Sequence, residues 1–391
     1  MRILYASERP PYPFFLGGAA RCAHKLLHTL TGELNVECAA VGSSDYTTTP
    51  WAFPSDSEFE ALEIRGAEHV GRTGTIDCGY PIRVFGDFEN TLSRFIDDFR
   101  PDVIWSQLEG ASNVLGLGNA KGIRGLLFVH DAEFDVHELR TIASLGCQVV
   151  CSSGFLAEKA GKVIGRTAHV VYPCPETKFG VVGDAHGHIT MINPHRVKGI
   201  QTFFEIARRM PDENFLLVES WRLTDQGLAD LEEHLAKAPN VRFLRRVSDM
   251  RQIYAKTKLL LVPSTWEEGF GMVAVEAQSC RIPVIASSRG GLPESVGDGG
   301  SLVVDYLNAD AWVETIGSVL KDAERYAAFA TRAMRHAAGD AFTASCSARR
   351  FLEICSARVR PPNVLTRGMH ALVEGLDAVP WLGKMLRQMN R

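Results

Sequence analysis

The chain has 391 residues, of which 46% are hydrophobic and 23% are charged, so it is long enough for two domains of ordinary size. A formal net charge of −4 gives no reason to expect nucleic acid as a partner. Nine cysteines without a CxxC pair indicate buried reduced thiols rather than a disulfide framework or a zinc site. No apolar run approaches the roughly 18 residues of a membrane span, and "MRILYASERPP" turns polar too early for a signal peptide, which predicts a cytoplasmic protein.

The first part of the chain alternates short apolar runs with amphipathic stretches. The runs are "RILYA", "VECAAVG", "DVIWSQ", "GLLFVHD" and "CQVVCSS", and the first is followed by the helical pattern "AARCAHKLLHTL". Continuous apolar runs between helical patterns are typical of strands that are buried on both faces of a parallel sheet. We therefore predict a Rossmann-like, doubly wound α/β domain over residues 1–172.

A second domain is predicted from a break in this rhythm. Residues 173–188 are rich in proline and glycine and have no sustained period, so they form the predicted linker. The rhythm restarts with "HITMIN", "NFLLVES" and "KLLLVPS", which predicts a second Rossmann-like domain over residues 189–341. Residues 342–391 are predicted to be C-terminal helices that pack back on the first domain. Two such domains bring the carboxyl ends of both sheets to one cleft, where α/β proteins bind ligands.

The stretch "LLLVPSTWEEGFGMVAVEAQSC" reads as a strand, a loop and a helix that begins near Phe270. The free N–H groups of a helix start suit an anion, so they are predicted to face a diphosphate. Glu276 shares a helix face with Val273 and Cys280, and its carboxylate needs hydrogen-bond donors, which a ribose diol supplies. Glu268 precedes the helix and can hold sugar hydroxyls. The predicted donor-binding residues of this stretch are Gly269, Phe270, Gly271, Met272 and Glu276.

These two glutamates, with seven residues between them and "PVIASSRGGLPESV" after them, closely resemble the signature of retaining, nucleotide-sugar-dependent glycosyltransferases of the GT-B fold, specifically the large family 4. The resemblance extends to "GG" at Gly17 and Gly18, to "FVHD" ending at Asp131, and to "VKG" ending at Gly199. It implies two Rossmann-like domains that face a central cleft and hold a nucleotide-sugar donor between them. It also implies that no metal ion or other cofactor is needed.

The resemblance gives roles to residues of both domains. Gly17 and Gly18 lack a Cβ, so their amides can approach a phosphate closely. His130, at the end of a buried strand, is implied to contact the donor sugar. Lys198 matches the lysine that precedes a glycine in the family and offsets charge on the leaving diphosphate, and Arg196 is the nearest substitute for the usual arginine. The implied catalytic residues are His130, Arg196, Lys198 and Glu268.

The spacing of the two glutamates bears on the reaction. Eight positions of helical rise separate them by roughly 10 Å or more, whereas the carboxyl groups of a retaining glycosidase lie about 5 Å apart. The resemblance instead implies transfer of a sugar from a UDP- or GDP-sugar to an acceptor hydroxyl with retention, in the synthesis of a glycan, a glycolipid or a glycosylated metabolite. Two alternatives stay open: a non-transferring enzyme of this fold, such as a UDP-sugar 2-epimerase, and a sugar-nucleotide-binding protein without catalysis.

Some positions depart from the family's pattern or carry two interpretations. Arg281 stands where most members end the helix with a glycine, a position that often needs a positive φ. Arg245 also replaces a glycine, close to the expected base-binding loop. Asp131 either belongs to the site or caps a turn, and the turn "GGLPE" that ends at Glu294 is expected to be mainly structural.

The acceptor is assigned to the first domain. Its region 43–86 is expected to be loop-rich, and loops on a scaffold set specificity, but the residues there do not identify a lipid, an oligosaccharide or a small aglycone. The tail "MHALVEGLDAVPWLGKMLRQMNR" combines apolar residues with basic ones and is broken by Pro380. Packing on the first domain is favoured for it, with peripheral contact to the inner face of the membrane as the alternative.

Overall fold

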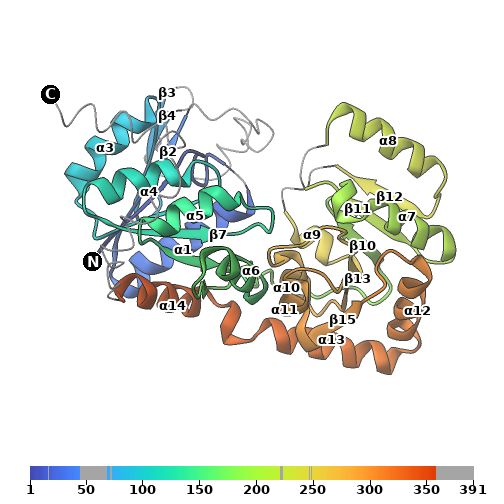
Figure 1. Ribbon diagram of the computed structural model, residues 1–391. Helices are drawn as coiled ribbons and strands as arrows, with labels where there is room; N and C mark the ends of the chain where they lie inside the picture. Colours follow the sequence, from blue (N-terminus) through green and yellow to red (C-terminus); the bar gives the residue numbers. More distant parts are fainter. Residues whose placement is uncertain are drawn as a thin grey trace. The chain divides into compact units, whose positions relative to one another are not determined.

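The computed structural model describes residues 1–15, 17–44, 75–220, 223–245, 247 and 249–357, and the backbone alone of 68–70, 73 and 74. Residues Met1–Cys355 form one compact unit. Within the described residues this unit contains two separate sheets, each with helices packed on both of its faces (Figure 1). The chain is therefore an α/β protein with two Rossmann-like domains. No described helix combines the length and the apolar character needed to cross a bilayer.

The first sheet has the strand order β3-β4-β5-β2-β1-β6-β7-β8-β9, and all its pairs are parallel except those of β4. Its strands are β1 (Arg2–Ser7), β2 (Glu37–Ser43), β3 (Glu68–Val70), β4 (Thr73–Asp77), β5 (Pro81–Phe85), β6 (Val103–Gln107), β7 (Arg124–Val129), β8 (Gln148–Cys151) and β9 (His169–Val170). Its helices are α1 (Gly18–Leu34), α3 (Phe88–Phe99), α4 (Ala111–Ala120), α5 (Val136–Ser144) and α6 (Gly154–Ile164).

The second sheet has the order β12-β11-β10-β13-β14-β15 and is parallel throughout. Its strands are β10 (His188–Ile192), β11 (Phe215–Val218), β12 (Val241–Leu244), β13 (Thr257–Val262), β14 (Val284–Ser287) and β15 (Gly300–Val303). Its α-helices are α7 (Ile200–Arg209), α8 (Asp225–Ala236), α9 (Arg251–Tyr254), α10 (Met272–Ser279), α11 (Leu292–Val296), α12 (Ala309–Leu320) and α13 (Ala323–Ala337). Short 3₁₀ turns are η2 (Arg196–Lys198), η3 (Gly297–Gly299) and η4 (Asp340–Phe342).

The strands predicted from continuous apolar runs are buried on both faces. Every residue of β6 and five of the six residues of β1 are buried, and alternate residues enter different cores. Ile3 and Tyr5 pack beneath α1, whereas Leu4 and Ala6 pack against α3 and α4 on the other face. This two-sided burial explains why the strands read as continuous apolar runs instead of alternating ones.

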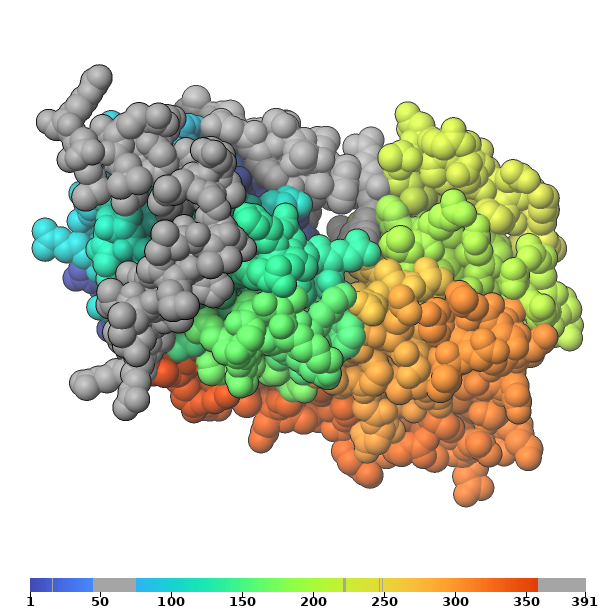
Figure 2. Space-filling view, in the orientation of Figure 1, coloured from blue at the N-terminus to red at the C-terminus, as the bar shows by residue number. Residues whose placement is uncertain are grey.

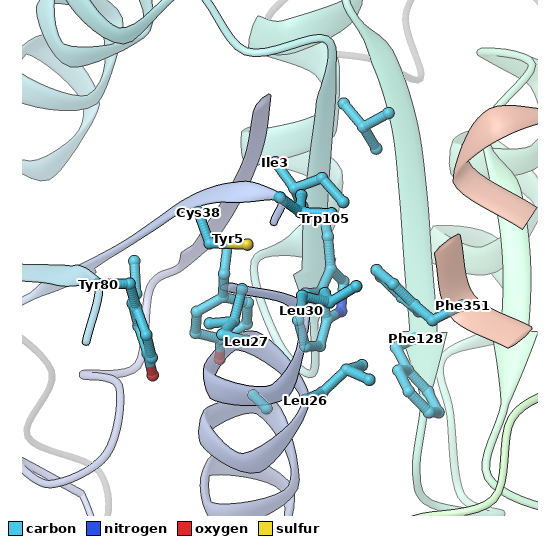
Figure 3. Close-up of a cluster of buried hydrophobic side chains, with 14 of the residues drawn as sticks. Ile3, Tyr5, Leu26, Leu27, Leu30, Cys38, Tyr80, Trp105, Phe128 and Phe351 are labelled. Atoms are coloured by element: carbon cyan, nitrogen blue, oxygen red, sulfur yellow. The ribbon is translucent and has the colours of Figure 1, made fainter. Parts of the chain in front are cut away.

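Helix α14 (Ala344–Ser356) returns to the first sheet after the second domain is complete. The ring centre of Phe351 lies 4.9 Å from that of Trp105 and 6.4 Å from that of Phe128. Figure 3 shows these rings together, beside Tyr5 and Leu30 of the same core. The residues after Ala357, including the tail whose packing or membrane contact the sequence left open, lie outside the described residues.

The expectation that region 43–86 is loop-rich is partly wrong. Strands β3, β4 and β5 lie within it and extend the first sheet beyond β2. They are three to five residues long and carry polar residues, as in "TGTID", so they lack the continuous apolar run that marks a central strand. Residues 45–67 of this region lie outside the described residues.

In each sheet the strand order reverses beside the first strand of the domain. Strand β1 lies between β2 and β6, and strand β10 lies between β11 and β13. At such a reversal the connections on the two sides leave toward opposite faces of the sheet, which opens a crevice at the carboxyl ends of the strands. Lys198 follows β10 and Glu268 follows β13, so these two predicted site residues come from the two sides of the crevice in the second domain.

Candidate active site

Lys198 and Glu268 form an ion pair at this crevice. The Lys198 Nζ lies 2.8 Å from Glu268 Oε1 and 2.9 Å from Oε2, and the two side chains are only 12% and 10% exposed. The Ser264 hydroxyl donates to Glu268 Oε1 at 2.5 Å. A pair this buried stabilises the fold only when its remaining hydrogen-bonding positions are filled, and Ser264 fills one of them. The structure therefore shows an ion pair between two residues for which the sequence predicted separate contacts to the donor.

The loops that carry this pair are held together by their backbones. The Thr265 N–H donates to the Val197 carbonyl at 2.9 Å, which ties the loop after β13 to η2. Gly199 has φ +85°, and a Cβ on it would lie 1.8 Å from the Pro263 carbonyl oxygen. Only glycine fits this close approach, so the glycine of "VKG" sets the distance between the two loops. This backbone contact therefore fixes the position of the backbone from which the Lys198 side chain extends toward Glu268.

The loop from Gly269 to Met272 leads into α10 in the predicted way. Helix α10 begins at Met272, and Gly271 caps it with φ 92°. A Cβ on Gly269 would lie 1.8 Å from the His130 carbonyl oxygen, so glycine is required where this loop meets the first domain. Phe270 is buried against Tyr172, with ring centres 5.4 Å apart. The first N–H groups of α10 have no acceptor within the helix and are available to an anion.

Glu276 points into packed surface, in agreement with the helix-face argument. The Tyr254 hydroxyl donates to Glu276 Oε2 at 2.9 Å, and Tyr254 itself is fully buried beneath the edge of Phe179. Burial raises the pKa of Glu276, and the hydrogen bond from Tyr254 partly opposes this rise. The sequence did not reveal Tyr254 as a partner, because α9 and α10 meet only in the folded domain.

His130 lies at the end of β7 with its ring stacked on Phe128, the ring centres being 4.3 Å apart. Its Nε2 is 2.8 Å from Gln107 Oε1, while Gln107 Nε2 donates to the Tyr5 hydroxyl at 2.9 Å. Burial lowers the pKa of His130 from 6.5 to about 4, so the ring is neutral at pH 7. Because Nε2–H donates to the amide oxygen, Nδ1 is left as a hydrogen-bond acceptor. Gln107 is a positioning residue that the sequence did not single out.

Gly17 and Gly18 lie at the start of α1, as predicted. A Cβ on Gly17 would lie 2.7 Å from the Phe15 ring, and a Cβ on Gly18 would lie 3.0 Å from the Met272 Cε. The Cys22 Sγ lies 3.3 Å from the Met272 Sδ. These contacts bring the start of α1 in the first domain to the start of α10 in the second.

Arg196 is the predicted site residue that the structure leaves apart. It is exposed on η2 and makes no ion pair within the described part of the chain. The register that holds the usual arginine of the family is occupied by Asn193, which is buried and has φ 68°. Asparagine adopts this left-handed conformation more often than most other residues do.

Asp131 does not cap a helix. Helix α5 is capped instead by Asp135, whose Oδ1 accepts from the N–H groups of His137 and Glu138 at 2.7 and 3.0 Å. Within the described residues the Asp131 carboxylate has no hydrogen-bond partner. Desolvation by the surrounding protein raises its pKa, and the charges of Arg9 and Lys198 oppose the rise. Asp131 keeps exposed surface and lies near charged groups of both domains.

Arg281 and Arg245, which stand where the family usually has glycine, differ in their local structure. Arg281 takes φ 59° directly after α10, so an arginine adopts the left-handed conformation that a glycine usually supplies. Arg245 follows β12 and its Nε lies 3.4 Å from Oε2 of Glu219, a carboxylate that is 1% exposed at the end of β11. The Leu223 N–H donates to the other oxygen of Glu219 at 2.9 Å. Both arginines thus fit their local backbone.

Metal ligands do not gather within the described residues, where no group of three or more His, Cys, Asp or Glu side chains could hold an ion. The predicted site residues of the second domain are instead paired with one another or with a hydroxyl group, as Lys198, Glu268 and Glu276 show. The part of the site that the structure brings together is therefore a cation and a carboxylate beside a helix start, with Glu276 one turn further along that helix.

Two consecutive Rossmann-like domains, with site residues at the carboxyl ends of both sheets, define the GT-B class of proteins. Residues 194–336, which make up most of the second domain, match the family model described as glycosyl transferases group 1. This match confirms the resemblance to glycosyltransferases for that part of the chain.

Solved structures share the fold over most of the chain. HepE from Anabaena, in complex with UDP, matches with a TM-score of 0.72 at 18% identity and covers 91% of this chain and 100% of its own. Sucrose-phosphate synthase from Thermosynechococcus elongatus matches with a TM-score of 0.69 at 16% identity, over 90% of this chain and 97% of its own. At these identities the likeness establishes the fold alone.

Curated relatives are similar over a shorter stretch. The D-inositol 3-phosphate glycosyltransferase of Corynebacterium kroppenstedtii is 33% identical over 178 residues, which is 42% of this chain and 39% of the relative. The protein of that name from Mycobacteroides abscessus is 35% identical over 171 residues, 41% of this chain and 38% of the relative. The match thus spans about two fifths of either relative's length.

Proposed function

We propose that this protein transfers a sugar from a nucleoside diphosphate sugar, with a UDP-sugar as the first candidate, to a hydroxyl group of an acceptor with retention of configuration. The observation that carries the proposal is the Lys198–Glu268 pair between the ends of β10 and β13. A glycosyl donor needs a cation for its leaving diphosphate and a carboxylate for its sugar hydroxyls at adjacent points. The group 1 domain supports this reaction class, and the HepE structures with UDP and with UDP-glucose support the choice of donor.

The diphosphate is proposed to bind at the start of α10. The N–H groups from Gly269 to Met272 and the positive end of the helix dipole favour an anion there. Gly18 packs against Met272, so the turn at the start of α1 is close enough to add backbone amides from the first domain. Lys198 would exchange part of its contact with Glu268 for a phosphate oxygen, and exposed Arg196 would reach the same charge from solvent.

The ribose is proposed to bind to Glu276. Its Oε2 is occupied by the Tyr254 hydroxyl, so Oε1 is the oxygen assigned to the ribose diol. A carboxylate that is held at one oxygen keeps a fixed orientation for the other, and this orientation lowers the entropic cost of binding. Glu276 must be ionised for this role, since only the ionised form can accept from both hydroxyls.

The chemical step is proposed to need no base from the protein. The bond between the sugar C1 and the phosphate oxygen breaks, a bond from C1 to the acceptor oxygen forms on the same face, and the acceptor proton passes to the leaving phosphate oxygen. Lys198 and the α10 amides stabilise the charge that develops on the diphosphate. The neutral His130 ring accepts a sugar hydroxyl at Nδ1, and Glu268 accepts others. We propose no metal ion, because these groups supply the positive charge.

The acceptor is proposed to approach beside Asp131. This carboxylate follows His130 directly, and its hydrogen-bonding positions are unoccupied by any described residue. An acceptor hydroxyl can donate to it while the oxygen lone pair turns toward the sugar. Asp131 would then orient the acceptor without taking its proton.

The proposal is tested by incubating the protein with UDP-, GDP- and ADP-sugars in the presence of EDTA, and by measuring released nucleotide and altered sugar. Slow release of UDP that disappears in Glu268→Ala supports the transferase. A change of the sugar without release of nucleotide indicates the epimerase alternative, and binding without either product indicates a binding protein. Loss of activity in EDTA contradicts the metal-free proposal.

A further inference from the structure

Helix α6 of the first domain begins against a carboxylate of the second domain. The N–H groups of Gly154 and Phe155 donate to Glu294 Oε2 and Oε1 at 2.7 and 2.8 Å. The Tyr172 hydroxyl donates to Glu294 Oε2 at 3.0 Å. The Ser153 Oγ accepts from the Leu156 N–H at 3.1 Å, so it satisfies the next amide of the helix. Charge-assisted bonds of a carboxylate to helix-start amides are among the stronger hydrogen bonds in proteins.

A second contact lies one turn further along α6. The Lys159 Nζ is 2.6 Å from Oε2 of Glu267, the residue that precedes Glu268. Both side chains are more than a third exposed, so this pair alone contributes little to stability. In Figure 2 the green surface of the segment around α6 lies directly against the orange surface of the α10–α11 segment. Helix α6 thus holds the second domain at Glu267 and at Glu294.

The two held points lie on either side of the backbone of Glu268. The Gly291 N–H donates to the Glu268 carbonyl at 2.8 Å, and Glu294 lies on α11 just after this glycine. A Cβ on Gly290 would lie 2.4 Å from the same carbonyl oxygen. The turn before α11 is therefore in direct contact with the Glu268 backbone. A displacement of Glu294 would shift this turn and, through it, the Glu268 backbone.

We propose that Glu294 is a positioning residue, which fixes the loop of Glu268 relative to His130 by anchoring α11 to the start of α6. The contact itself follows from the geometry, whereas its effect on turnover rests on the proposed function. The turn "GGLPE" then has a role in the site as well as in the local fold. The role is an indirect one, since Glu294 touches neither donor nor acceptor in this account.

The contact is tested with Glu294→Gln, which keeps the shape of the side chain and removes its charge. Glu314→Gln is the matched control, because Glu314 is an exposed acid on α12 of the same domain. Hydrogen exchange measured by mass spectrometry is expected to become about tenfold faster in the peptide that begins α6 and in the peptide from Ser264 to Met272. The peptide that contains β7 is expected to keep its protection, which shows that the fold is intact.

Measurement of turnover distinguishes a positioning role of Glu294 from a role in helix capping alone. In Glu294→Gln, kcat for release of UDP from UDP-glucose is expected to fall about tenfold while UDP affinity measured by calorimetry stays unchanged. Lys159→Gln should cause a smaller fall in the same direction. Unchanged exchange at α6 in Glu294→Gln contradicts the contact, and faster exchange with unchanged kcat contradicts the positioning role. A wild-type protein that releases no nucleotide refutes the proposed function, whereas exchange in the Ser264–Met272 peptide still decides whether Glu294 orders that loop.

Discussion

The ammonium group of Lys198 lies 4.4 Å from the ring centre of Trp266, so the lysine is held between an aromatic face and the Glu268 carboxylate. The electron-rich face of an indole attracts a cation by about 0.5–2 kcal/mol, depending on solvent exposure. Replacing the ring by Trp266→Leu is therefore expected to lower kcat for nucleotide release by about twofold to thirtyfold.

Trp266→Phe is the control for this prediction. It keeps an aromatic face, and it removes an indole N–H that is buried without a partner among the described residues. We expect a smaller loss of kcat and no loss of thermal stability. Equal rates in Trp266→Leu, Trp266→Phe and the wild type would show that the ring does not hold Lys198.

The hydroxyl of Tyr254 is predicted to affect donor binding through Glu276. In Tyr254→Phe the carboxylate loses a hydrogen bond that opposes the rise of its pKa, so this pKa is expected to rise further. UDP binding, measured by calorimetry, should weaken about threefold to tenfold at pH 7. Because the ionised carboxylate binds ribose, affinity is lost as pH falls through the pKa of Glu276, and in the variant this loss should begin at higher pH.

Tyr326→Phe provides the matched control for the loss of a hydroxyl group. The Tyr326 hydroxyl donates to the Lys258 carbonyl at 2.9 Å in the same domain, away from the proposed site. Its removal should leave UDP affinity and its pH dependence unchanged. An equal effect of both variants would assign the change to general loosening of the domain.

The neutral state of His130 is predicted to make stability depend on pH. The pKa of His130 is about 4 in the folded protein and 6.5 when unperturbed, so between these values the unfolded chain binds a proton that the folded one does not. The free energy of unfolding should therefore fall as pH drops from 6.5 to about 4, by about 3 kcal/mol for this group.

His130→Asn should remove this part of the slope in urea unfolding measured at several pH values. The variant keeps a slope due to His24, whose pKa is likewise lowered to about 4 by burial. His186→Asn, at an exposed histidine of the second domain, is the matched control for the loss of an imidazole. A slope that is unchanged in His130→Asn would show that burial does not lower the pKa of His130 in the folded protein.

The sequence predicted local features better than contacts between distant residues. The start of α10, the strands before it and the left-handed position of Arg281 follow from patterns within a few residues of each other. The Lys198–Glu268 bond spans 70 positions, and neither residue's neighbours indicate that the two side chains neutralise each other. Tyr254 and Gln107 were missed for the same reason, since each is recognised only by the side chain it meets across the fold.

Short strands and domain contacts show the same limit. Strands β4 and β5 are paired on both sides, but they are short and partly polar, and buried and exposed residues alternate along β5, so they lack the continuous apolar run of a central strand. Glu294 was expected to be structural, and its contact with Gly154 spans 140 positions. A turn rich in glycine indicates a bend in the chain. It does not reveal which helix start will donate hydrogen bonds to the carboxylate of Glu294.

Asp131 is predicted to affect the acceptor and not the donor. In Asp131→Asn, sugar transfer from UDP-glucose to glycerol, used as a generic hydroxyl acceptor, should fall about tenfold relative to transfer to water. UDP affinity should stay unchanged, because the carboxylate is assigned no contact with the nucleotide. Glu133→Gln, two residues further along the exposed loop, is the control. A proportional loss of transfer and hydrolysis would contradict an orienting role toward the acceptor.

The central claim is that a sugar-bearing diphosphate binds where α10 begins, against Lys198. A crystal structure of the protein with UDP tests it most directly. We predict that the diphosphate accepts from the N–H groups at the start of α10 and that the Lys198 Nζ contacts a phosphate oxygen. Nucleotide bound elsewhere, with the start of α10 unoccupied and both Lys198 contacts to Glu268 intact, would contradict the account.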